Sequence, residues 1–482
     1  MTVRRPKRKP SKPAADFLDI YDISCGRRLA LSVLQQHDVT GRFVSDLLKD
    51  MDARHSLTRQ ERGLAVDVAA GTIRHRRTID LLLQSQVKRP RAEVEPDLWR
   101  ILQTATQQLV YGRTPDHAAV DATVELTRSL GRPRWAGFVN GVLRNIGRLL
   151  TNEVATQPSR CAVPLPSGEW RLLSQDVFSC PLTSPVDYFG EAFSLPRAIS
   201  RRWRQRMSSD DLYLAGFHSL MLPTTGLRIN PATSTAAQLT DQLTEAGVTV
   251  RPGSFDESLR LESAGRIESL PGFEEGAWSI QDESAMVASR LLNPQPGEKI
   301  LDLCAAPGGK STHLAELSRD QAQIWACDVS EDRITRIEQN VSRLGHSSIR
   351  AVLIHRDGGN IPDQAFDAVL VDVPCSNTGV LSRRPEARWR FAESEIEDLT
   401  RLQMRLLMTA FDRVSPGGRI VYSTCSIEPE ETTQLVEAAA NSVPDMELVS
   451  SQLQLPGQPA DGAFTALLRR RESAPASVES AS

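Results

Sequence analysis

The sequence has few cysteines for its length, and none of them form a close pair. The 482 residues include seven cysteines, and no Cys-x-x-Cys spacing occurs. An odd number of widely separated cysteines does not suit a disulfide framework, and a structural zinc site usually contains such a close pair. The sequence therefore predicts no disulfide framework and no metal site. It favours a reducing compartment, which we take to be the cytoplasm.

Long apolar runs are also missing. No stretch reaches the roughly 18 consecutive apolar residues that a membrane-spanning helix requires. The basic start of the chain leads into Pro and Lys rather than into an apolar segment, which is unlike a secretory signal. We therefore expect no membrane span and no signal peptide.

A strong net charge is absent too, although the charge is unevenly placed. The formal net charge is −3, so the chain as a whole is not a general nucleic-acid binder. Residues 1–18 nevertheless begin with a cluster of basic side chains and are predicted to form a disordered basic arm, either solvated or in loose contact with phosphates. Residues 473–482 are predicted to be a disordered tail. The basic residues of the arm are Arg4, Arg5, Lys7, Arg8, Lys9 and Lys12.

The sequence also lacks a phosphate-binding loop of the P-loop type. Residues 301–312 read LDLCAAPGGKST, in which an apolar run is followed by Pro, two Gly and Lys. The P-loop pattern requires a Gly where this chain has Cys304. A strand that turns sharply into a helix at this point therefore needs a different explanation.

The first third of the chain is predicted to be helical. Residues 19–150 carry apolar residues at helical spacing, interrupted by Gly and Pro, and we expect an all-α domain there. Residues 151–195 are rich in Pro and Ser and poorly periodic, which predicts a linker or an irregular insertion.

A small α+β subdomain is predicted at residues 196–275. GLRIN and VTVRP have the composition of short strands, and STAAQLTDQLTEAG between them has helical spacing. The preceding segment PRAISRRWRQR clusters arginines around Trp203. Such a helix could grip an RNA backbone, or it could be a solvated helix with one buried Trp.

Strands and helices alternate over residues 276–472. The predicted strands are KILDLCAA, QIWACDVS, IRAVLIHRD, FDAVLVDVP and GGRIVYSTCS. Continuous apolar strands with helical crossovers predict a mostly parallel, doubly wound, Rossmann-like sheet. Ligands bind such sheets at the carboxyl ends of the strands, so the residues there are the candidates for a site.

Acidic residues follow three of these strands. Asp328, Asp357 and Asp372 end the second, third and fourth strands. An acid after the second strand suits hydrogen bonds to ribose hydroxyls. A single Asp at such a place is more often a helix cap, but three of them with a Gly-rich turn predict an adenosine pocket.

Two of the cysteines occupy the same predicted edge. Cys375 follows Asp372 in DVPCS, and Cys425 ends the fifth strand in STCS. Cys304 and Cys327 have the surroundings of small buried apolar residues. An accessible thiol with electropositive neighbours is a nucleophile, so Cys375 and Cys425 are the candidates for chemistry.

These motifs carry a resemblance to a known family. CAAPGGK, DVPCS and STCS together resemble the RNA cytosine-5 methyltransferases, and QDESA at 281–285 fits as well. The segments QLVYG, HAAV and FVNGVLR are similar to the NusB fold. The combination, over residues 20–470, resembles the Sun-type branch that acts on bacterial 16S ribosomal RNA. The chain departs from the family at Asn377, where Gly or Ala is frequent, and in the irregular segment 151–195.

The resemblance implies a fold, a cofactor and a mechanism. It implies a multidomain protein with a NusB-like, RNA-binding domain at 19–150 and a methyltransferase domain at 276–472 that uses S-adenosylmethionine on ribosomal RNA, with the small subunit favoured. Cys425 would add to carbon 6 of cytosine, Cys375 would assist its release, and Asp372 would bond to ring N3. The segment RRPEARWR would contact RNA, with a surface ion-pair cluster as the alternative. The residues implied to hold the cofactor are Cys304, Ala305, Ala306, Pro307, Gly308, Gly309, Lys310, Asp328, Asp357 and Asp372.

Other functions remain open on the residues alone. The same chemistry could act on transfer RNA or 23S ribosomal RNA, or the chain could be an inert RNA-binding module. Methylation of an exocyclic adenine nitrogen is a further class, but it generally uses an aromatic residue where this chain has Cys375-Ser376. The last alternative is a redox or metal-binding role for Cys375 and Cys425, although two thiols alone make a weak metal site.

Overall fold

The computed structural model describes residues 23–52, 57–262, 267–356, 358–458 and 460–472. The chain divides into two compact units, residues 1–200 and 201–482. Segment 151–195 belongs to the first unit, whereas the regions predicted at 196–275 and 276–472 lie almost wholly in the second. The predicted basic arm and C-terminal tail lie outside the described residues.

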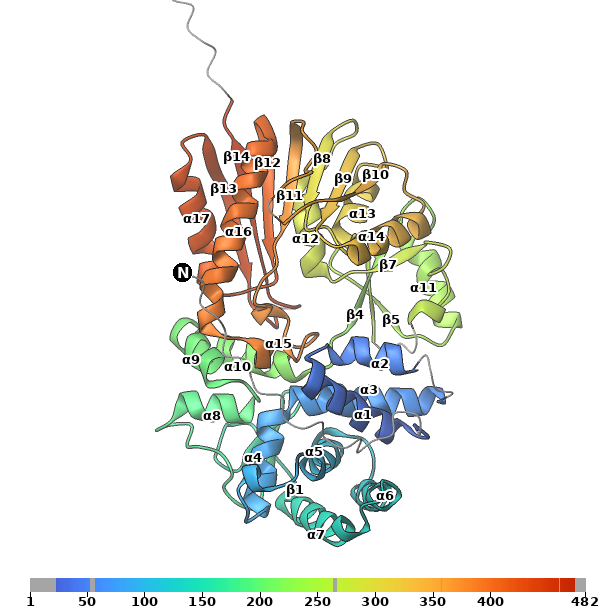
Figure 1. Ribbon diagram of the computed structural model, residues 1–482, viewed down its shortest axis with the longest axis vertical. Coiled ribbons are helices and arrows are strands. Elements are labelled where there is room, and N and C mark those ends of the chain that lie inside the picture. Colours follow the sequence, from blue (N-terminus) through green and yellow to red (C-terminus); the bar gives the residue numbers. More distant parts are fainter. Residues whose placement is uncertain (1–22, 53–56, 263–266, 357, 459, 473–482) are drawn as a thin grey trace, which may run out of the picture. The chain divides into compact units, whose positions relative to one another are not determined.

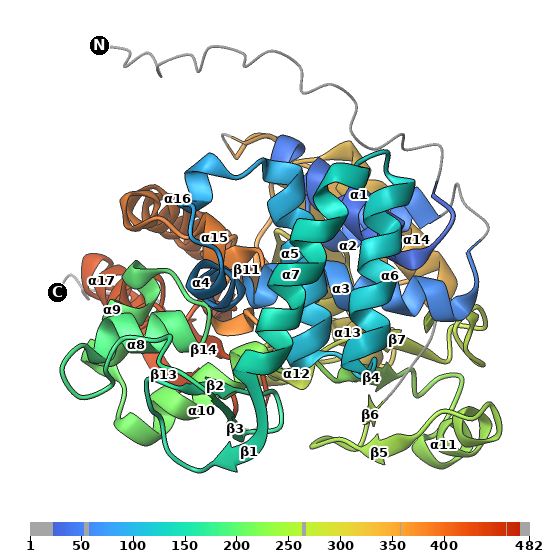
Figure 2. The ribbon, with the colours of Figure 1, turned by 90° about the horizontal axis from the view of Figure 1, so that it is seen from below.

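Among the described residues, the N-terminal unit is helical from residue 26 to residue 149 with no strand, which confirms the predicted all-α region. The last helix, α7, shows the reason: its buried Ala136, Val139, Leu143 and Ile146 recur at helical spacing, and Pro133 occupies its first turn. Figure 2 shows α6 and α7 side by side. The helices are α1 (Gly26–Thr40), α2 (Val44–Asp52), α3 (Arg59–Arg74), α4 (Arg76–Gln86), η1 (Arg91–Glu93), α5 (Pro96–Tyr111), α6 (Asp116–Ser129) and α7 (Pro133–Leu149).

Segment 151–195 is folded, and its prediction as a linker or irregular insertion is wrong. It forms a three-stranded antiparallel sheet in the order β1-β3-β2, followed by a helix. Gly168, with a φ of 89°, closes the turn between β2 and β3. The strands are too short for a periodic pattern to emerge from the sequence. The elements are β1 (Leu150–Ala155), β2 (Ala162–Pro164), β3 (Trp170–Leu173) and α8 (Pro185–Ala192), and α9 (Arg197–Arg206) leads into the second unit.

The C-terminal unit contains a small four-stranded antiparallel sheet in the order β5-β6-β4-β7. The predicted strands at β4 and β5 and the predicted helix α11 are present, and β6 and β7 were not predicted. Because β7 pairs with β4, this sheet extends past the predicted boundary at residue 275. The elements are α10 (Ser209–Leu220), β4 (Thr225–Ile229), α11 (Ala236–Glu245), β5 (Val250–Pro252), β6 (Ser258–Leu261), η2 (Ile267–Ser269) and β7 (Trp278–Ile280).

A seven-stranded sheet in the order β10-β9-β8-β11-β12-β14-β13 forms the rest of this unit (Figure 1). Neighbouring strands from β10 to β12 are parallel, as predicted, and β14 runs antiparallel to both β12 and β13. The order reverses between β8 and β11, which is where such sheets bind ligands. The strands are β8 (Lys299–Leu303), β9 (Gln323–Asp328), β10 (Ile349–Leu353), β11 (Phe366–Asp372), β12 (Val414–Thr424), β13 (Met446–Gln454) and β14 (Ala463–Arg470).

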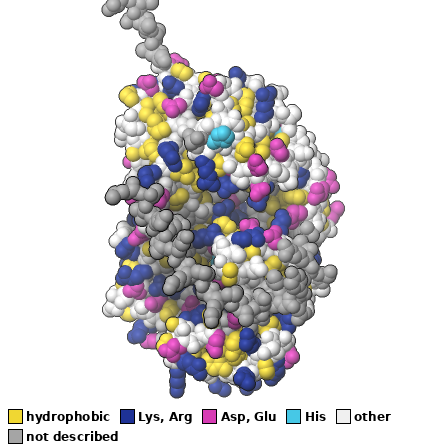
Figure 3. Space-filling view, viewed as in Figure 1, with side chains coloured by type: hydrophobic (Ala, Val, Ile, Leu, Met, Phe, Trp, Pro, Cys, Tyr) yellow, Lys and Arg dark blue, Asp and Glu magenta, His cyan; other side chains and the backbone are white. Residues whose placement is uncertain are grey.

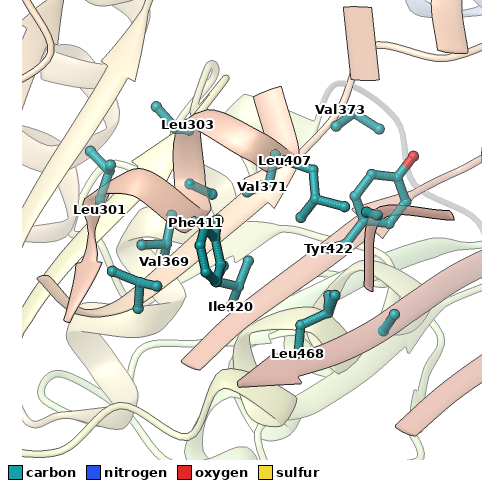
Figure 4. Packing of buried hydrophobic residues seen from close by; sticks show 14 of the residues in the cluster. Leu301, Leu303, Val369, Val371, Val373, Leu407, Phe411, Ile420, Tyr422 and Leu468 are labelled. Atoms are coloured by element: carbon teal, nitrogen blue, oxygen red, sulfur yellow. The ribbon is translucent and has the colours of Figure 1, made fainter. Parts of the chain in front are cut away.

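Helices cover both faces of the large sheet. On one face, Leu407 and Phe411 of α16 pack with sheet residues such as Val371 (Figure 4). On the other, Leu314 of α13 packs with Ile300. Both faces are therefore buried, which is why these strands read as continuous apolar runs. The helices are α12 (Glu283–Leu292), α13 (Gly309–Leu317), α14 (Glu331–Leu344), η3 (Thr378–Val380), α15 (Ala387–Arg390), α16 (Glu393–Arg413), η4 (Pro429–Glu431) and α17 (Thr433–Ser442).

A buried arginine joins the small sheet to helix α13. Arg228 of β4 is fully buried, and its guanidinium makes two hydrogen bonds to Glu316, of 2.6 and 2.8 Å. It also donates to the carbonyl of Gly309 at 2.6 Å and to Thr312 at 2.8 Å. Since Gly309 begins α13, Arg228 fixes the position of the Gly-rich turn that precedes this helix.

We expect Arg228→Met to destabilise the C-terminal unit strongly, because it leaves the buried Glu316 carboxylate without its partner. Such a loss costs about 3–5 kcal/mol. Urea unfolding of the full chain, read by proteolysis and mass spectrometry of peptides from residues 201–482, measures it. Arg251→Met, which removes an exposed pair with Glu262, is the control and should cost at most about 1 kcal/mol. If the two variants behave alike, the buried pair does not have this role.

Candidate functional site

The turn between β8 and α13 has an unusual backbone. Cys304 has a φ of 63°, and Gly308, the residue before α13, has a φ of 96°. The Gly308 amide donates to the carbonyl of Ala305 at 2.7 Å, and Asn340 donates to the carbonyl of Pro307 at 2.8 Å. The predicted strand–turn–helix is therefore present, closed by a tight turn with its first residue in a left-handed conformation.

Carboxylates surround this turn. Asp328 ends β9, as predicted, and is buried; it accepts hydrogen bonds from the amides of Val329 at 2.7 Å and Ala306 at 3.3 Å. Asp302, inside β8, is fully buried and accepts from Ser311 at 2.5 Å. Asp302 was not predicted as a site residue, although an acid in the middle of an apolar strand was a visible signal.

These carboxylates make the turn electronegative. Burial raises the pKa of Asp302 to about 7. Burial, followed by the charges of Asp328, Asp372 and Asp302, raises the pKa of Cys304 to about 12. A negative field of this kind suits a ligand with cationic groups and ribose hydroxyls, and it does not suit a phosphate. S-Adenosylmethionine, with its sulfonium, ammonium and ribose, fits this set of residues.

The third predicted acid cannot be placed. Strand β10 ends at Leu353, earlier than the predicted strand, and Asp357 lies outside the described residues.

The two candidate cysteines lie in contact. The Sγ atoms of Cys375 and Cys425 are 3.2 Å apart, and both side chains are half-buried. The cause is the register of the sheet: Asp372 of β11 lies beside Ser423 of β12, so both chains leave the sheet at the same edge. The structure therefore brings together the two cysteines that the sequence placed at the same edge of the sheet.

The contact couples the ionisation of the two thiols. Their hydrogen bond lowers the pKa of Cys375, and the same bond, with burial, raises the pKa of Cys425. Either sulfur can act as the donor. The pair therefore loses one proton readily, with the other thiol stabilising the thiolate, and holds the second proton firmly.

Buried hydrogen bonds hold the two cysteine segments together. The Glu431 carboxylate is fully buried and accepts from the amide of Ser376 at 2.9 Å and from the Ser426 hydroxyl at 2.5 Å. Gln403 of α16 donates to the same carboxylate at 2.9 Å. Because Ser376 and Ser426 directly follow the two cysteines, Glu431 fixes their separation. It was not predicted, since it lies in an acidic run that reads as a surface segment.

Close backbone packing adds to this arrangement. The amide of Gly379 donates to the carbonyl of Cys425 at 3.0 Å. A Cβ at Gly379 would lie 2.7 Å from that carbonyl oxygen and 2.5 Å from the carbonyl oxygen of Gly462. Only glycine fits at this position.

Lys310 and Asp372 form an ion pair beside the thiols. Lys310 Nζ donates to Asp372 at 2.7 Å, and Asp372 is the more exposed of the two. Charge attraction by Asp372 raises the pKa of Lys310 although burial opposes it. The ammonium of Lys310 is therefore held directly against the Asp372 carboxylate.

The predicted arginine clusters are largely engaged within the protein. In α9, Arg202 pairs with Glu428 and Glu430, and Trp203 is fully buried, as the alternative of a helix with one buried Trp requires. In RRPEARWR, Arg383 pairs with Asp282 and Asp461. Arg388 is fully buried and donates to the carbonyls of Ser219 and Leu381. Arg383 and Arg388 thus fit the alternative of an internal cluster, whereas Arg384 is exposed, and contact of this segment with RNA stays a prediction. Basic and acidic side chains are interspersed over the face seen in Figure 3.

A separate cavity of about 660 Å³ lies away from the cysteines. Its lining includes Asn230, His313, Glu316 and His346, and none of the predicted site residues. It follows the side of α13 that faces the small sheet. Cavity size alone therefore does not locate the chemistry in this chain.

Two findings concern the described residues only. They contain no group of three or more His, Cys, Asp or Glu side chains arranged to hold a metal ion. They also contain no helix that is both long and apolar enough to cross a membrane.

Comparison with known proteins assigns the family. The family model described as 16S rRNA methyltransferase RsmB/F matches residues 289–469, and the NusB family matches residues 25–148. A ribosomal RNA small subunit methyltransferase B of Salmonella arizonae is 31% identical over 462 residues, which cover 92% of this chain and 98% of the relative. The chain belongs to the RsmB/F methyltransferase family. A relative of the same name from Klebsiella pneumoniae is 31% identical over 465 residues, covering 93% of this chain and 98% of the relative.

Solved structures show the same fold. The crystal structure of PH0851 covers 96% of this chain and 100% of its own, with a TM-score of 0.71 at 22% identity. A methyltransferase homolog protein from Pyrococcus horikoshii covers 60% of this chain and 99% of its own, with a TM-score of 0.53 at 27% identity. The NusB-like helical domain and the Rossmann-like methyltransferase fold are thus both confirmed.

Membership of the RsmB/F family also identifies the cofactor. The protein is a methyltransferase, and its methyl donor is S-adenosylmethionine. The electronegative turn after β8 agrees with this, because it suits the cationic groups of that molecule.

We expect Asp302→Asn to change how stability depends on pH. The folded pKa of Asp302, about 7, lies above its ordinary value of 3.8. The protonated carboxyl therefore stabilises the fold at low pH, and this contribution is lost as the pH rises towards 7. The amide stays neutral, so the stability of the variant relative to wild type should rise between pH 4.5 and about pH 7 and then level off.

Urea unfolding of the full chain at several pH values, without added cofactor, measures this difference. Asp367→Asn is the control, because Asp367 is exposed at the opposite end of β11. A flat difference for Asp302→Asn across this range would contradict the proposed state of Asp302.

Proposed function

We propose that this protein methylates carbon 5 of a cytosine in small-subunit ribosomal RNA through a covalent adduct with Cys425. The observation that carries the proposal is the contact of 3.2 Å between Cys375 and Cys425 at the edge of the sheet where the cofactor turn also lies. The substrate is taken from the relatives, which are named ribosomal RNA small subunit methyltransferases B.

The thiol pair supplies the nucleophile, Cys425, and a second thiol, Cys375, that exchanges a proton with it. Carbon 5 of cytosine is a poor nucleophile until a thiolate adds to carbon 6. The pair has one proton that leaves readily, and exchange of the remaining proton across the contact places the thiolate on Cys425. Addition forms the bond between Cys425 Sγ and carbon 6 and moves electron density onto carbon 5 and the ring.

Asp372 and Lys310 stabilise the charge that develops on the ring. Asp372 is partly exposed, and its carboxylate accepts a hydrogen bond of 2.7 Å from the Lys310 ammonium. The pair therefore holds a proton that can be shared with ring N3 as N3 becomes more basic. Preorganised groups of this kind cost no rearrangement during the reaction.

The cofactor turn and the acids around it hold the methyl donor. When bound, S-adenosylmethionine supplies the activated methyl group that carbon 5 accepts. A base then removes the proton from carbon 5. The electron pair of that C–H bond forms the double bond between carbons 5 and 6 again, and Cys425 leaves carbon 6 as the thiolate, with Cys375 assisting this release. The residues that we propose to contact the donor are Cys304, Ala305, Ala306, Pro307, Gly308, Gly309, Lys310, Asp328, Asp357 and Asp372.

The target base must leave the stack of the RNA to reach the thiols. Unstacking costs a few kcal/mol and is cheapest where the strand is already single. An unpaired segment of the ribosomal RNA is therefore the proposed form of the substrate. The helical NusB-like domain is the proposed second RNA contact of the chain.

The decisive experiment compares cysteine variants with methyl-labelled S-adenosylmethionine and unmodified small-subunit ribosomal RNA. We expect 5-methylcytidine from the wild type and none from Cys425→Ala, which lacks the nucleophile. Cys375→Ala should trap the RNA on the protein, because release is blocked, and the adduct should survive a denaturing gel. Nucleoside chromatography and the gel are the two readouts.

Cys180→Ala, which removes a thiol of the N-terminal unit, is the control and should methylate as the wild type does. Full activity of Cys425→Ala would contradict the adduct. Label on transfer RNA or large-subunit RNA alone would keep the chemistry and correct the substrate.

A further inference from the structure

Asn377 touches both cysteine segments at once. Its Nδ2 donates to the carbonyl of Cys375 at 2.8 Å, and its Oδ1 accepts from the Cys425 thiol at 3.3 Å. Its φ of 60° lies in the left-handed region, which Asn tolerates better than most residues. The side chain is thus held in one orientation, with its oxygen on the thiol that we propose as the nucleophile.

The same oxygen accepts a hydrogen bond from an arginine. Arg384 donates to Asn377 Oδ1 at 3.0 Å. The backbone of Arg384 is anchored by its amide, which donates to the carbonyl of Val380 at 2.9 Å. Arg384, Asn377 and Cys425 therefore form a continuous hydrogen-bonded chain from the surface to the thiol, which we call the Arg384 chain.

Arg384 differs from the arginines around it. Arg383 is committed to two carboxylates, and Arg388 is buried on backbone carbonyls. Arg384 is exposed. A guanidinium has five N–H donors in one plane, and this geometry matches the paired oxygens of a phosphate. The bond to Asn377 uses one of these donors, so Arg384 can hold Asn377 and an incoming phosphate together.

We propose that Arg384 contacts a phosphate of the RNA strand that carries the target base, and that Asn377 couples this contact to the Cys425 thiol. This inference rests on the proposed function, since it assumes that RNA is the substrate. Arg384 is a positioning residue, because it acts on the thiol through Asn377. Asn377 is a catalytic residue, because it touches the reacting sulfur.

The coupling works through geometry and through charge. A phosphate that holds the guanidinium also orders Asn377, so the thiol points in one direction when the strand is bound. The positive charge of Arg384 favours the thiolate of Cys425, against the opposing charge of Asp372. Besides each other, the charged or titratable groups that interact with the two thiols include Asp372, Lys310, Arg384, Tyr422 and Glu431.

If Asn377 had only a structural role, its replacement would have different effects. Asn377 precedes the short helix η3, and a left-handed residue there could serve only to turn the chain. In that case its loss would lower stability without changing the reactivity of the thiols. Replacement by glycine separates the two roles, because glycine keeps the left-handed backbone and removes the amide.

The first test uses the free protein, without RNA or methyl donor. Alkylation of Cys425 by iodoacetamide is followed from pH 6 to pH 10 and quantified by peptide mass spectrometry. We expect Arg384→Ala to slow alkylation of Cys425 about threefold at pH 7, because the thiolate loses a favourable charge. Arg384→Lys should restore part of the rate, because it keeps the positive charge. In an Asn377→Gly background, Arg384→Ala should change the alkylation rate much less, because the guanidinium is no longer held near the thiol by the amide of Asn377.

The second test measures binding of unmodified small-subunit ribosomal RNA at several salt concentrations. Loss of one phosphate contact on a single strand should reduce the slope of log Kd against log salt by about 0.7 in Arg384→Ala. Asn377→Gly should leave that slope unchanged and lower kcat with little change in KM. Arg469→Ala is the matched control, because Arg469 is exposed at the opposite edge of the sheet, and its slope should equal that of the wild type.

The outcomes separate this inference from the proposed function. An unchanged salt slope in Arg384→Ala overturns the phosphate contact, and unchanged alkylation overturns the coupling to the thiol. Both tests are read on variants whose thermal unfolding midpoint equals that of the wild type. If no RNA yields 5-methylcytidine, the proposed function fails, whereas the alkylation test still decides whether the Arg384 chain controls Cys425.

Discussion

The buried carboxylate of Glu431 is the interaction on which the site depends. Its partners, Ser376 and Ser426, directly follow the two cysteines, and Gln403 ties it to α16. A buried carboxylate without donors would be very costly, so the donors and the carboxylate specify one arrangement together. The contact between Cys375 and Cys425 follows from this arrangement, and their shared ionisation follows from the contact.

The side of the site that we propose for the cofactor depends on a second buried charge. Arg228 connects the small sheet to the first residues of α13, and the acids around the preceding turn give it a negative field. The small sheet thus supports the turn that we propose as the cofactor site. Lys310, at the start of the same helix, links this turn to Asp372 and so to the thiols.

The parts that could be predicted from the sequence are those with local signals. Parallel strands buried on both faces read as apolar runs. The carboxyl ends of these runs gave the candidates Asp328, Asp372, Cys375 and Cys425. Hydrogen bonds and ion pairs between residues far apart in the sequence leave no such local signal. Glu431 and Arg383 look like solvated charges until the fold supplies their partners, and strands as short as β2 leave no period.

The pairing of β11 with β12 also sets the distance between the two cysteines, and the segment that connects the two strands does not affect this distance. Asp372 lies beside Ser423, and each cysteine follows its strand by a short fixed step. Residues 381–413 leave the sheet and return to it without entering this register. Related chains could therefore gain or lose residues in the connecting loops, and acquire new substrate contacts there, while the two sulfurs stay in contact.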